Sequence, residues 1–595
     1  MRLKLLISFF FLIWLSLLVR VFYLSVQSNN YYSKLSSHNT IKTKKIAPIR
    51  GEIHDRNNLP IAINKLGFSI QLLPHLKHKG DNSELDIAIR DLVHNLPDLN
   101  ATKIKKRYLR NDSYYNHNDI RVVDFVSYEK IMPVYSPLHL NDNILVIPAP
   151  KRYYPYSDLA AHIIGYVAKA NKKDVERDDL AKLIGSTGKS GVEKYYNSYL
   201  EGVAGQRKIK VSAQNEVIKE LSYLKAIENR DITLTLDMRL QKYISEQFKA
   251  RAGAVIVMSV DGEILAAASF PEYDLNSFVS GISSKQWKAL IESIDTPFTN
   301  KIINGLYPPG STIKTGLGLV YLSSGISQWW TTNCTGTMKL GKRNFRCWKH
   351  SGHGKTDIRK AIRESCDDYF YKGSLKVGIA DMSFGLKRFG LGSKTGVDLP
   401  NEFIGTVPSR EWKRKRFNQP WYIGETLNSS IGQGDFLTTP LQIAQFTALM
   451  ATGRLVKPHL AKSIDGEEVM PEFEDVLTPS QHKKLPIIQQ AMRQVCQHSK
   501  GTAVHFMHAK IPVAGKTGTA QVIGISQEIK QRINERDMRY YTRSHAWFTT
   551  YAPARDPQYI VTVLVEHGGH GGAAAGGMVS NIYNKLLEFG YIKKK

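Results

Sequence analysis

The sequence predicts an α+β protein with a single N-terminal transmembrane helix followed by at least two domains. A chain of 595 residues is too long for one hydrophobic core. The N-terminus is strongly apolar, and strand-like patterns stand at both ends of the C-terminal half with long helical runs between them. This order places strands from both ends of the second domain in one sheet.

The segment from Leu5 to Val26 is predicted to span a membrane. It is almost wholly apolar as far as Val19, and Arg20 can extend to the headgroups, so the segment can cross a hydrocarbon core of roughly 30 Å. A cleaved secretory signal is the alternative, but no Ala-x-Ala-like site follows, which favours an uncleaved anchor. The count of flanking positive residues does not decide the orientation. The short tail favours a cytoplasmic N-terminus with the rest of the chain outside.

Two folded modules are expected after the anchor. The first begins near residue 46, where Pro48 to Asn57 is typical of a turn feeding an extended segment. The second opens with an alternating strand, Asp231 to Asp237. The predicted organisation is a cytoplasmic tail (1–4), a signal anchor (5–26), a linker (27–45), a non-catalytic module (46–230) and a C-terminal domain (231–595).

The expected elements of the C-terminal domain follow from local patterns. After the first strand, a helix runs through Leu240 to Phe248, and a hairpin of residues 253–258 and 263–268 turns at Asp261-Gly262, a favoured turn pair. The end of the chain returns to strands at residues 546–551 and 559–566, with a closing helix from about Asn581.

The net charge of +28 is spread along the chain. No Gly-rich or aromatic-interleaved basic tract resembles a nucleic-acid module, so a nucleic-acid partner is not expected. A basic surface near an anionic membrane or cell-wall polymer is the better interpretation.

Three motifs in order carry the chemistry: Ser311-Thr312-Ile313-Lys314, Ser365-Cys366-Asp367 and Lys516-Thr517-Gly518-Thr519. Each alone is weak, because Ser-x-x-Lys also occurs at Ser222 and at Ser480. The ordered set is typical of serine acyltransferases that react with penicillin-like substrates.

The first motif supplies a nucleophile and a base. A serine hydroxyl needs an adjacent base to take its proton, and Ser311 and Lys314, three apart at a helix start, would lie on one helical face. Pro308 to Gly310 mark the break before that helix, whose free amides favour a developing oxyanion. A second cation, Lys516, together with burial, would let Lys314 act as the base.

The other two motifs complete the predicted site. Ser365 lies in a mostly helical stretch, where its hydroxyl can bridge the two lysines and pass a proton to the leaving amine. Lys516 to Thr519 suit an edge strand along which a substrate lies extended. There Gly518 keeps the strand free of a side chain, while Lys516 and the hydroxyls of Thr517 and Thr519 can hold a carboxylate.

With these motifs the chain resembles the class B, monofunctional penicillin-binding proteins over essentially its whole length. Tyr307-Pro308-Pro309-Gly310 before the serine is similar to the cell-elongation type, whereas division-type relatives more often carry Glu-Pro-Gly. Further matching segments are Arg50-Gly51-Glu52-Ile53-His54-Asp55-Arg56, Gly191-Val192-Glu193-Lys194, Ser430-Ile431-Gly432-Gln433-Gly434 and Thr438-Thr439-Pro440-Leu441-Gln442.

The resemblance implies a fold and an activity. The fold is an elongated pedestal carrying a serine β-lactamase-like transpeptidase domain, an antiparallel sheet flanked by helices, in the periplasm and tethered to the inner membrane. Ser311 would attack the carbonyl between the two terminal D-alanines of a peptidoglycan stem peptide, with the amides of Ser311 and Thr519 as the oxyanion hole, and β-lactams would acylate it. No cofactor is needed. The implied partners are a SEDS-family glycosyltransferase and elongation-complex membrane proteins.

One residue departs from the family pattern. The middle motif ends in Asp367, where most relatives carry Asn. An ionised carboxylate cannot donate a hydrogen bond to a substrate carbonyl, so Asp367 must be protonated or paired with a lysine or another donor.

Three of the four cysteines bracket a histidine between the first two motifs. Cys334-x12-Cys347-x5-His353-x12-Cys366 offers a ligand set that suits a tetrahedral structural zinc. The alternative is a disulfide between Cys334 and Cys347, with Cys366 a buried thiol. Spacing alone leaves both open.

Other functions share parts of this pattern. A division-type transpeptidase, a carboxypeptidase or a β-lactamase would use the same serine and lysines. A non-catalytic β-lactam sensor or scaffold would keep the fold, but a receptor is expected to have several spanning helices or a cytoplasmic effector. The large non-catalytic module and the membrane tether favour transpeptidation.

Overall fold

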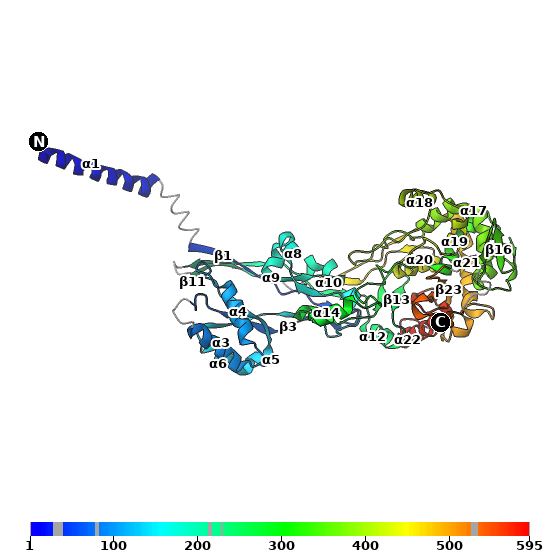
Figure 1. The fold of residues 1–595 in the computed structure, drawn as a ribbon, viewed down its shortest axis with the longest axis horizontal. Coiled ribbons are helices and arrows are strands. Elements are labelled where there is room, and N and C mark those ends of the chain that lie inside the picture. The colour runs from blue at the N-terminus through cyan, green and yellow to red at the C-terminus, as the bar shows by residue number, and fades with distance from the viewer. Residues whose placement is uncertain are drawn as a thin grey trace.

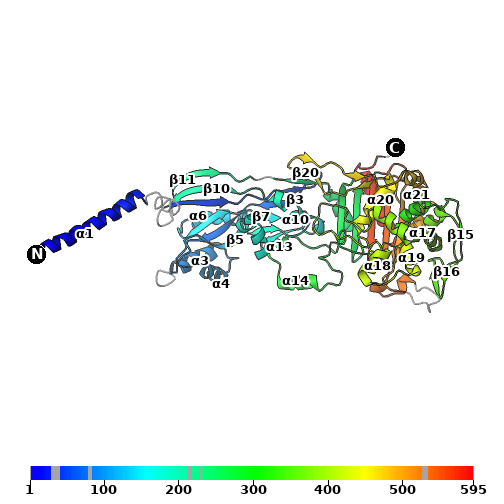
Figure 2. The same cartoon turned by 90° about the horizontal axis from the view of Figure 1, so that it is seen from above.

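The computed structural model describes residues 2–27, 40–77, 83–211, 217–227, 230–524 and 534–593. A lone helix stands at one end of an elongated molecule, and the C-terminal domain forms the other end (Figure 1). Figure 2 shows the same order from a second direction, with the first module between the two ends. Residues 28–39 of the predicted linker lie outside the described residues.

The N-terminal helix is apolar and unpacked. α1 covers Arg2–Phe22 and continues as a π-helical turn, η1, over Tyr23–Gln27. Within the described residues, Leu3–Val26 is the one helical stretch long and apolar enough to cross a membrane. Its side chains are exposed throughout, as expected for a segment whose solvent is lipid. The predicted anchor, residues 5–26, lies within this helical stretch.

The first module contains a small domain with a core of its own. β4 (Gly67–Leu72) pairs with β5 (Ile120–Ser127) and β6 (Ile144–Pro148). Two helices, α3 (Ser83–Asn95) and α4 (Ala101–Asn111), share a hydrophobic core with this sheet. Ile70 and Leu72 on β4 share this core with Leu92 and Tyr108 from the helices. The segment between β5 and β6 forms α5 (Tyr128–Ile131), η2 (Met132–Val134) and α6 (Tyr135–His139).

A second sheet lies toward the N-terminal helix in Figure 1, with the order β1-β10-β11. Its strands are β1 (Ile41–Ile46), β10 (Gly205–Val211) and β11 (Val217–Leu224). The remaining elements of the first module are α7 (Ala161–Ile164), β8 (Val167–Lys169), α8 (Lys172–Arg177), α9 (Asp179–Ile184), β9 (Ser186–Gly188), α10 (Gly191–Tyr195) and α11 (Asn197–Leu200).

One six-stranded sheet joins the first module to the C-terminal domain. Its order is β21-β20-β12-β2-β3-β7, and β2 pairs in parallel with β12 through Ile53 and Ile232. Strands from both sides of the predicted boundary at residue 230 therefore share a sheet. Their bounds are β2 (Ile53–His54), β3 (Pro60–Lys65), β7 (Lys151–Tyr153), β12 (Ile232–Leu234), β20 (Ala461–Ile464) and β21 (Glu467–Glu468).

A buried carboxylate ties together separate segments of the first module beside this sheet. Glu193 is fully buried and accepts hydrogen bonds from Arg50 Nε at 2.8 Å and from Arg152 Nε at 2.7 Å. Arg152 also donates to the carbonyl of Gly51. The two guanidinium groups compensate the charge that burial would otherwise make costly.

The C-terminal domain is built on an antiparallel sheet with the order β14-β13-β25-β24-β23. Adjacent residues on a strand point to opposite faces. Thr549 bonds to Thr447 on α20, whereas Thr550 bonds to Tyr583 on α22, so these helices cover opposite faces. The bounds are β13 (Gly253–Ser259), β14 (Ile264–Phe270), β23 (Ala514–Ala520), β24 (His545–Ala552), β25 (Tyr559–Val565), α20 (Pro440–Thr452) and α22 (Gly571–Glu588).

The predicted elements of this domain are present with shifted ends. The β13–β14 hairpin turns at Asp261-Gly262, and β24 and β25 pair as expected. The closing helix begins at Gly571, ten residues before the predicted Asn581. The prediction was wrong because a glycine-rich run has poor intrinsic helix propensity. Further helices of this domain are α12 (Met238–Gln247), α13 (Asn276–Ser280), α14 (Ser284–Ile291), α18 (Arg410–Phe417), α19 (Ile423–Ser430) and α21 (Pro479–Gln497). Two short strands, β19 (Leu455–Val456) and β22 (Phe473–Glu474), pair with each other.

Candidate active site

The first motif forms a tight turn in front of a buried helix. Gly310–Ile313 is a 3-10 turn, η3, and α15 follows over Lys314–Ser323. Gly310 has a φ of 55°, and a Cβ there would lie 2.8 Å from the carbonyl oxygen of Thr519. Only glycine allows this turn to touch the third motif so closely.

Both motif lysines are fully buried, and both contact the middle motif. Lys314 Nζ donates to Asp367 Oδ1 at 2.5 Å and lies 3.4 Å from Ser365 Oγ. Lys516 Nζ donates to Ser365 Oγ at 3.0 Å and to the carbonyl of Thr517 at 2.7 Å. The hydroxyl of Ser365 therefore lies between the side-chain nitrogen atoms of the two lysines.

Ser365 occupies the break between two helices, α16 (Ile358–Arg363) and α17 (Asp367–Arg388). The prediction placed it in a mostly helical stretch, but its own φ is 55°, in the left-handed region. A non-glycine residue there costs about 1 kcal/mol or more, so the surrounding contacts must hold it.

Ser311 is the most accessible of these groups. Its side chain lines the pocket and is partly exposed, and within the described ranges its hydroxyl makes no hydrogen bond. The structure brings Ser311 and Lys314 to one site, but the hydrogen bonds of Lys314 go to the middle motif.

The third motif lies on β23, the edge strand of the sheet. Thr517 Oγ1 bonds to Thr502 Oγ1 at 2.7 Å, and Gln433 Nε2 donates to the carbonyl of Thr519 at 3.1 Å. Gly518 lines the pocket, and its surroundings give a second reason for a residue without a side chain. A Cβ at Gly518 would lie 2.9 Å from the Thr312 side chain, so this glycine lets the strand pack against the nucleophile turn.

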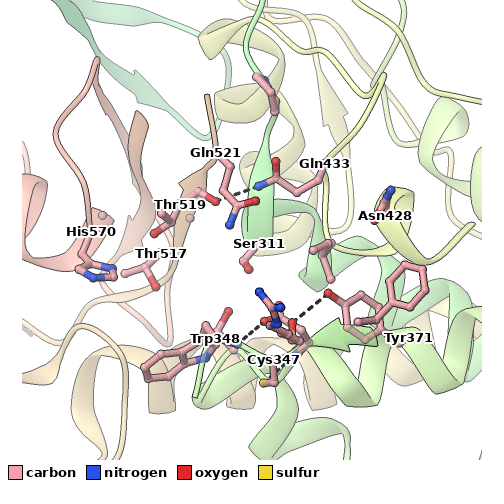
Figure 3. Close-up of a pocket in the computed structure, with 18 of the residues that line it drawn as sticks. Ser311, Cys347, Trp348, Tyr371, Asn428, Gln433, Thr517, Thr519, Gln521 and His570 are labelled. Carbon is pink, nitrogen blue, oxygen red and sulfur yellow. Dashed lines mark hydrogen bonds between the residues drawn. The ribbon is translucent and has the colours of Figure 1, made fainter. Parts of the chain in front are cut away.

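The motifs meet in an open pocket of about 1720 Å³. In Figure 3, Ser311 lies near the middle, with Thr517 and Thr519 on one side and Trp348 and Cys347 below. The pocket is also lined by residues of a hairpin that comes between the first two motifs. Its strands are β16 (Thr337–Leu340) and β17 (Arg343–Arg346), and two flanking strands, β15 (Thr332–Cys334) and β18 (Gly354–Thr356), pair with each other.

Asp367 is paired on both of its oxygens. Oδ1 accepts from Lys314 Nζ, and Oδ2 accepts from the backbone N–H of Trp348 at 2.9 Å. Burial raises the pKa of Asp367, while the charge of Lys314 opposes that rise. Of the two possibilities drawn from the sequence, the structure shows a pairing with lysine.

Burial lowers the pKa of Lys516 well below its ordinary value, and the nearby charge of Lys314 adds to this effect. A lysine with a lowered pKa exchanges protons more readily near neutral pH. Lys516 is therefore suited to move protons through the hydroxyl of Ser365.

The four predicted metal ligands converge. Cys334, Cys347, His353 and Cys366 are all buried, and their ligand atoms lie within 4.8 Å of one another. His353 Nδ1 is 3.6 Å from Cys334 Sγ and 3.4 Å from Cys347 Sγ, and all four cysteines of the chain are free thiols. Hydrogen bonding to Cys366 and to His353 lowers the pKa of Cys334 and of Cys347, against the effect of burial.

Comparison with known families identifies this arrangement. The penicillin binding protein transpeptidase domain matches residues 252–588, and the penicillin-binding protein dimerisation domain matches residues 45–234. The chain belongs to the penicillin-binding protein transpeptidase family. In this penicillin-binding protein, the transpeptidase match contains all three motifs and the Cys/His cluster, and the dimerisation match contains the small domain around β4.

Relatives are similar along nearly the whole chain. The peptidoglycan D,D-transpeptidase MrdA of Haemophilus influenzae is 33% identical over 96% of this chain and 89% of its own length. A complex between Penicillin-Binding Protein (PBP2) and MreC from Helicobacter pylori contains a chain that is 41% identical, with a TM-score of 0.84, over 93% of this chain and 100% of its own. A chain of a peptidoglycan synthase complex is 27% identical, with a TM-score of 0.72, over 100% of this chain and 99% of its own. The predicted family and fold class are confirmed.

Some pocket residues of this penicillin-binding protein carried no signal in the sequence. Trp348 and Thr502 reach the site from segments with no motif, and only the fold brings them there. Gln433 was within reach of sequence reasoning, because it lies in the segment Ser430 to Gly434 that supports the family resemblance.

Proposed function

We propose that this penicillin-binding protein is an elongation-type peptidoglycan D,D-transpeptidase with Ser311 as its nucleophile. The observation that carries the assignment is the position of Ser365 Oγ, within 3.4 Å of Lys314 Nζ and 3.0 Å of Lys516 Nζ, in the wall of the pocket that Ser311 lines. This arrangement supplies a nucleophile, a base and a proton relay in one place.

Acylation begins when Lys314 acts as the base and takes the proton of Ser311 as Oγ attacks the carbonyl between the two terminal D-alanines of a stem peptide. The C–N bond then breaks. Ser365, connected to both lysines, passes a proton to the departing amine of D-alanine. An amine from a neighbouring strand next attacks the ester and restores the hydroxyl of Ser311. β-Lactams acylate the same serine and stay attached.

β23 holds the substrate in this proposal. The backbone amides of Ser311 and Thr519 stabilise the oxyanion, a contribution commonly worth about 3 to 4 kcal/mol. The hydroxyls of Thr517 and Thr519, with the side-chain nitrogen of Lys516, bind the terminal carboxylate. Gly518 keeps this strand against the nucleophile turn. Asp367 binds Lys314 and aligns it before the proton transfer.

The nucleophile can be tested by covalent labelling. Ser311→Ala is expected to abolish labelling by a fluorescent penicillin, because Ser311 supplies the attacking hydroxyl in this proposal. Ser480→Ala is the matched control, since Ser480 also belongs to a Ser-x-x-Lys sequence but lies exposed at the start of α21. Mass spectrometry of the β-lactam-treated protein should place the adduct on Ser311. An adduct on any other residue rejects the assignment.

The Cys/His cluster is proposed as a structural zinc site, and the chemical step itself uses no cofactor. Ligands about 2.0–2.3 Å from a tetrahedral zinc lie roughly 3.3–3.8 Å apart. The measured separations of 3.6 and 3.4 Å between His353 and the two sulfur atoms fit this geometry. Zinc held by Cys334, Cys347, His353 and Cys366 would keep the hairpin segment against the middle motif.

Metal analysis tests the zinc proposal. Protein purified without chelators is expected to hold about one zinc per chain, and Cys334→Ser should lose most of it because a structural site needs four ligands. Cys496→Ala should retain the metal, since Cys496 lies outside the cluster. Protein without zinc, and with a Cys334–Cys347 disulfide found by thiol counting, would favour the alternative.

The proposed setting is the inner membrane, with α1 as the single pass among the described residues and the catalytic domain in the periplasm. The division into a tail (1–4), an anchor (5–26), a linker (27–45), a pedestal (46–230) and a transpeptidase domain (231–595) belongs to the same proposal. The solved relatives that include MreC or belong to a peptidoglycan synthase complex support elongation-complex partners. A SEDS-family glycosyltransferase is the proposed polymerase partner.

A further inference from the structure

The hairpin formed by β16 and β17 lines the catalytic pocket although none of the three motifs lies on it. Residues Arg343 to Trp348 contribute to the pocket wall, together with Thr337 from the opposite strand. The register pairs Leu340 with Arg343 and Thr337 with Arg346, so the two arginines stand at opposite ends of β17.

This hairpin is held firmly beside the site. The N–H of Cys347 donates to the carbonyl of Gly336 at 2.9 Å, and Tyr371 Oη donates to the carbonyl of Arg346 at 3.3 Å. The rings of Phe345 and Tyr371 meet edge to face, with centroids 5.8 Å apart. Since Tyr371 lies on α17, the hairpin is fastened to the helix that follows the middle motif.

The charges that line the pocket are unbalanced. Asp367 is its only acidic lining residue among those described, and both of its oxygens are already paired. Arg343 and Arg346 line the same pocket. Across the described ranges, the guanidinium of Arg343 has neither a hydrogen bond nor an ion pair, and its side chain is exposed to the pocket solvent.

The neighbouring lysines show that this placement is specific. Lys339 and Lys342 belong to the same hairpin and are also exposed, but neither lines the pocket. Exposed cations are usually solvated and without a ligand. Arg343 differs because it borders a cavity that must receive a peptide, and a guanidinium binds carboxylates through two parallel hydrogen bonds.

The pocket is also larger than its assigned ligand groups require. A volume of about 1720 Å³ exceeds the roughly 300–1,000 Å³ of an ordinary small-molecule site. The terminal carboxylate of the substrate is assigned to Thr517 and Thr519 on β23, so the residues of the peptide that precede the scissile bond must occupy the remaining space. A carboxylate on one of those residues would find Arg343 without a competing protein anion.

We propose that Arg343 forms a subsite for a second carboxylate, carried by the acyl donor on the N-terminal side of the scissile bond. Arg346 adds positive charge from the other end of β17. The inference rests on the proposed transpeptidase function and assigns to Arg343 a preference for donor peptides with a free side-chain carboxylate ahead of the terminal D-alanines. Arg343 binds and orients this group and takes no part in bond making.

Two penicillins isolate the effect of one carboxylate. Benzylpenicillin and carbenicillin differ only by a carboxylate on the carbon next to the side-chain amide. The second-order acylation rate constant of each is measured on the full-length protein in detergent. The ratio of carbenicillin to benzylpenicillin is expected to fall about tenfold in Arg343→Gln, which is typical for losing a hydrogen bond to a charged group. Arg343→Lys should recover part of this ratio by keeping the charge.

A control variant and a peptide pair complete the test. Lys342→Gln should keep the wild-type ratio of the two acylation rate constants. The change removes a positive charge near the pocket, but Lys342 does not line the pocket. N-acetylated Glu-D-Ala-D-Ala and Gln-D-Ala-D-Ala are then compared by D-alanine release, with the Glu peptide preferred only when Arg343 is present.

The outcomes separate the two proposals. If neither penicillin acylates the wild-type protein, the transpeptidase assignment fails and the subsite fails with it. If acylation is normal and the penicillin ratio is the same in the wild type and in Arg343→Gln, the subsite alone is rejected. A fall of equal size in Lys342→Gln also rejects it, because the effect would then be a general one of net charge.

Discussion

At the scale of single residues, the nucleophile turn is held by contacts from distant segments. Tyr307 Oη donates to Glu566 Oε1 at 2.5 Å, and Trp547 Nε1 donates to the carbonyl of Pro308 at 3.1 Å. The N–H of Gly310 donates to the carbonyl of Gly432 at 3.0 Å. Three separate strands or loops therefore set the direction of Ser311, which the motif alone leaves undetermined.

Tyr307→Phe tests this restraint. The change removes one hydrogen bond to a carboxylate and leaves Glu566 without that donor, so we expect a loss of about 1–3 kcal/mol of stability and slower β-lactam acylation. The melting temperature and the acylation rate constant are measured. Tyr307→Phe combined with Glu566→Gln should cost less than the sum of the single changes. Full additivity would show that the two side chains act independently.

At the scale of elements, α22 shows why a glycine-rich run can be helical. A Cβ at Gly571 would lie 2.1 Å from the carbonyl oxygen of Trp547, and one at Gly576 would lie 2.7 Å from the Phe506 side chain. The glycines let this helix lie directly on β24 and the neighbouring loop. Close packing overrides weak intrinsic propensity here, because helices in proteins draw most of their stability from tertiary contacts.

Two alanine substitutions in α22 should have opposite effects. Gly571→Ala is expected to lower the melting temperature by several degrees, because its methyl group meets backbone that cannot move away. Gly577→Ala should raise stability by about 0.5–1 kcal/mol, since a Cβ there has nothing within 4 Å and alanine favours the helix. Thermal unfolding of the two variants measures whether stability falls in the first and rises in the second. Destabilisation by Gly577→Ala would contradict the packing argument.

At the scale of the whole molecule, the first module and the catalytic domain pack against each other through side-chain contacts and are not connected by the chain alone. His162 on α7 contacts the ring of Tyr273, with centroids 5.0 Å apart, and its Nε2–H donates to the carbonyl of Pro297 at 2.6 Å. Asn300 donates in turn to the carbonyl of His162. A buried imidazole therefore lies at the junction of the two parts of the chain.

This histidine makes the junction sensitive to acid. Burial lowers the pKa of His162 to about 4, whereas an unfolded histidine titrates near 6.5. Between these values the unfolded chain binds more protons than the folded one, so stability is complete above about pH 6.5 and falls as the pH falls toward 4. At pH 5 the expected loss is about 2 kcal/mol.

Thermal unfolding between pH 7.5 and 5 measures this dependence. Over that interval the melting temperature of His162→Gln should fall less than that of the wild type, because glutamine cannot take up a proton at this position. His350→Gln, which removes an exposed histidine, should follow the wild type. Parallel curves for His162→Gln and the wild type would place the acid sensitivity elsewhere.

The sequence by itself was sufficient for features that depend on neighbouring residues. Sequence alone revealed the apolar segment from Leu5 to Val26, the β13–β14 hairpin and the three ordered motifs. Hydrophobic runs, turn pairs and short spacings are local properties of the chain. The family and fold class predicted from them are confirmed by the comparisons. The catalytic roles of Ser311 and Lys314 stay predictions.

Only the tertiary structure decided what depends on residues far apart in the chain. It paired Asp367 with Lys314, placed Ser365 between two lysines that lie 202 positions apart, and laid strands from both sides of residue 230 in one sheet. It also brought Arg343 into the pocket wall. No local pattern encodes these placements, because each results from the packing of the whole core around elements whose separate sequences are compatible with many neighbours.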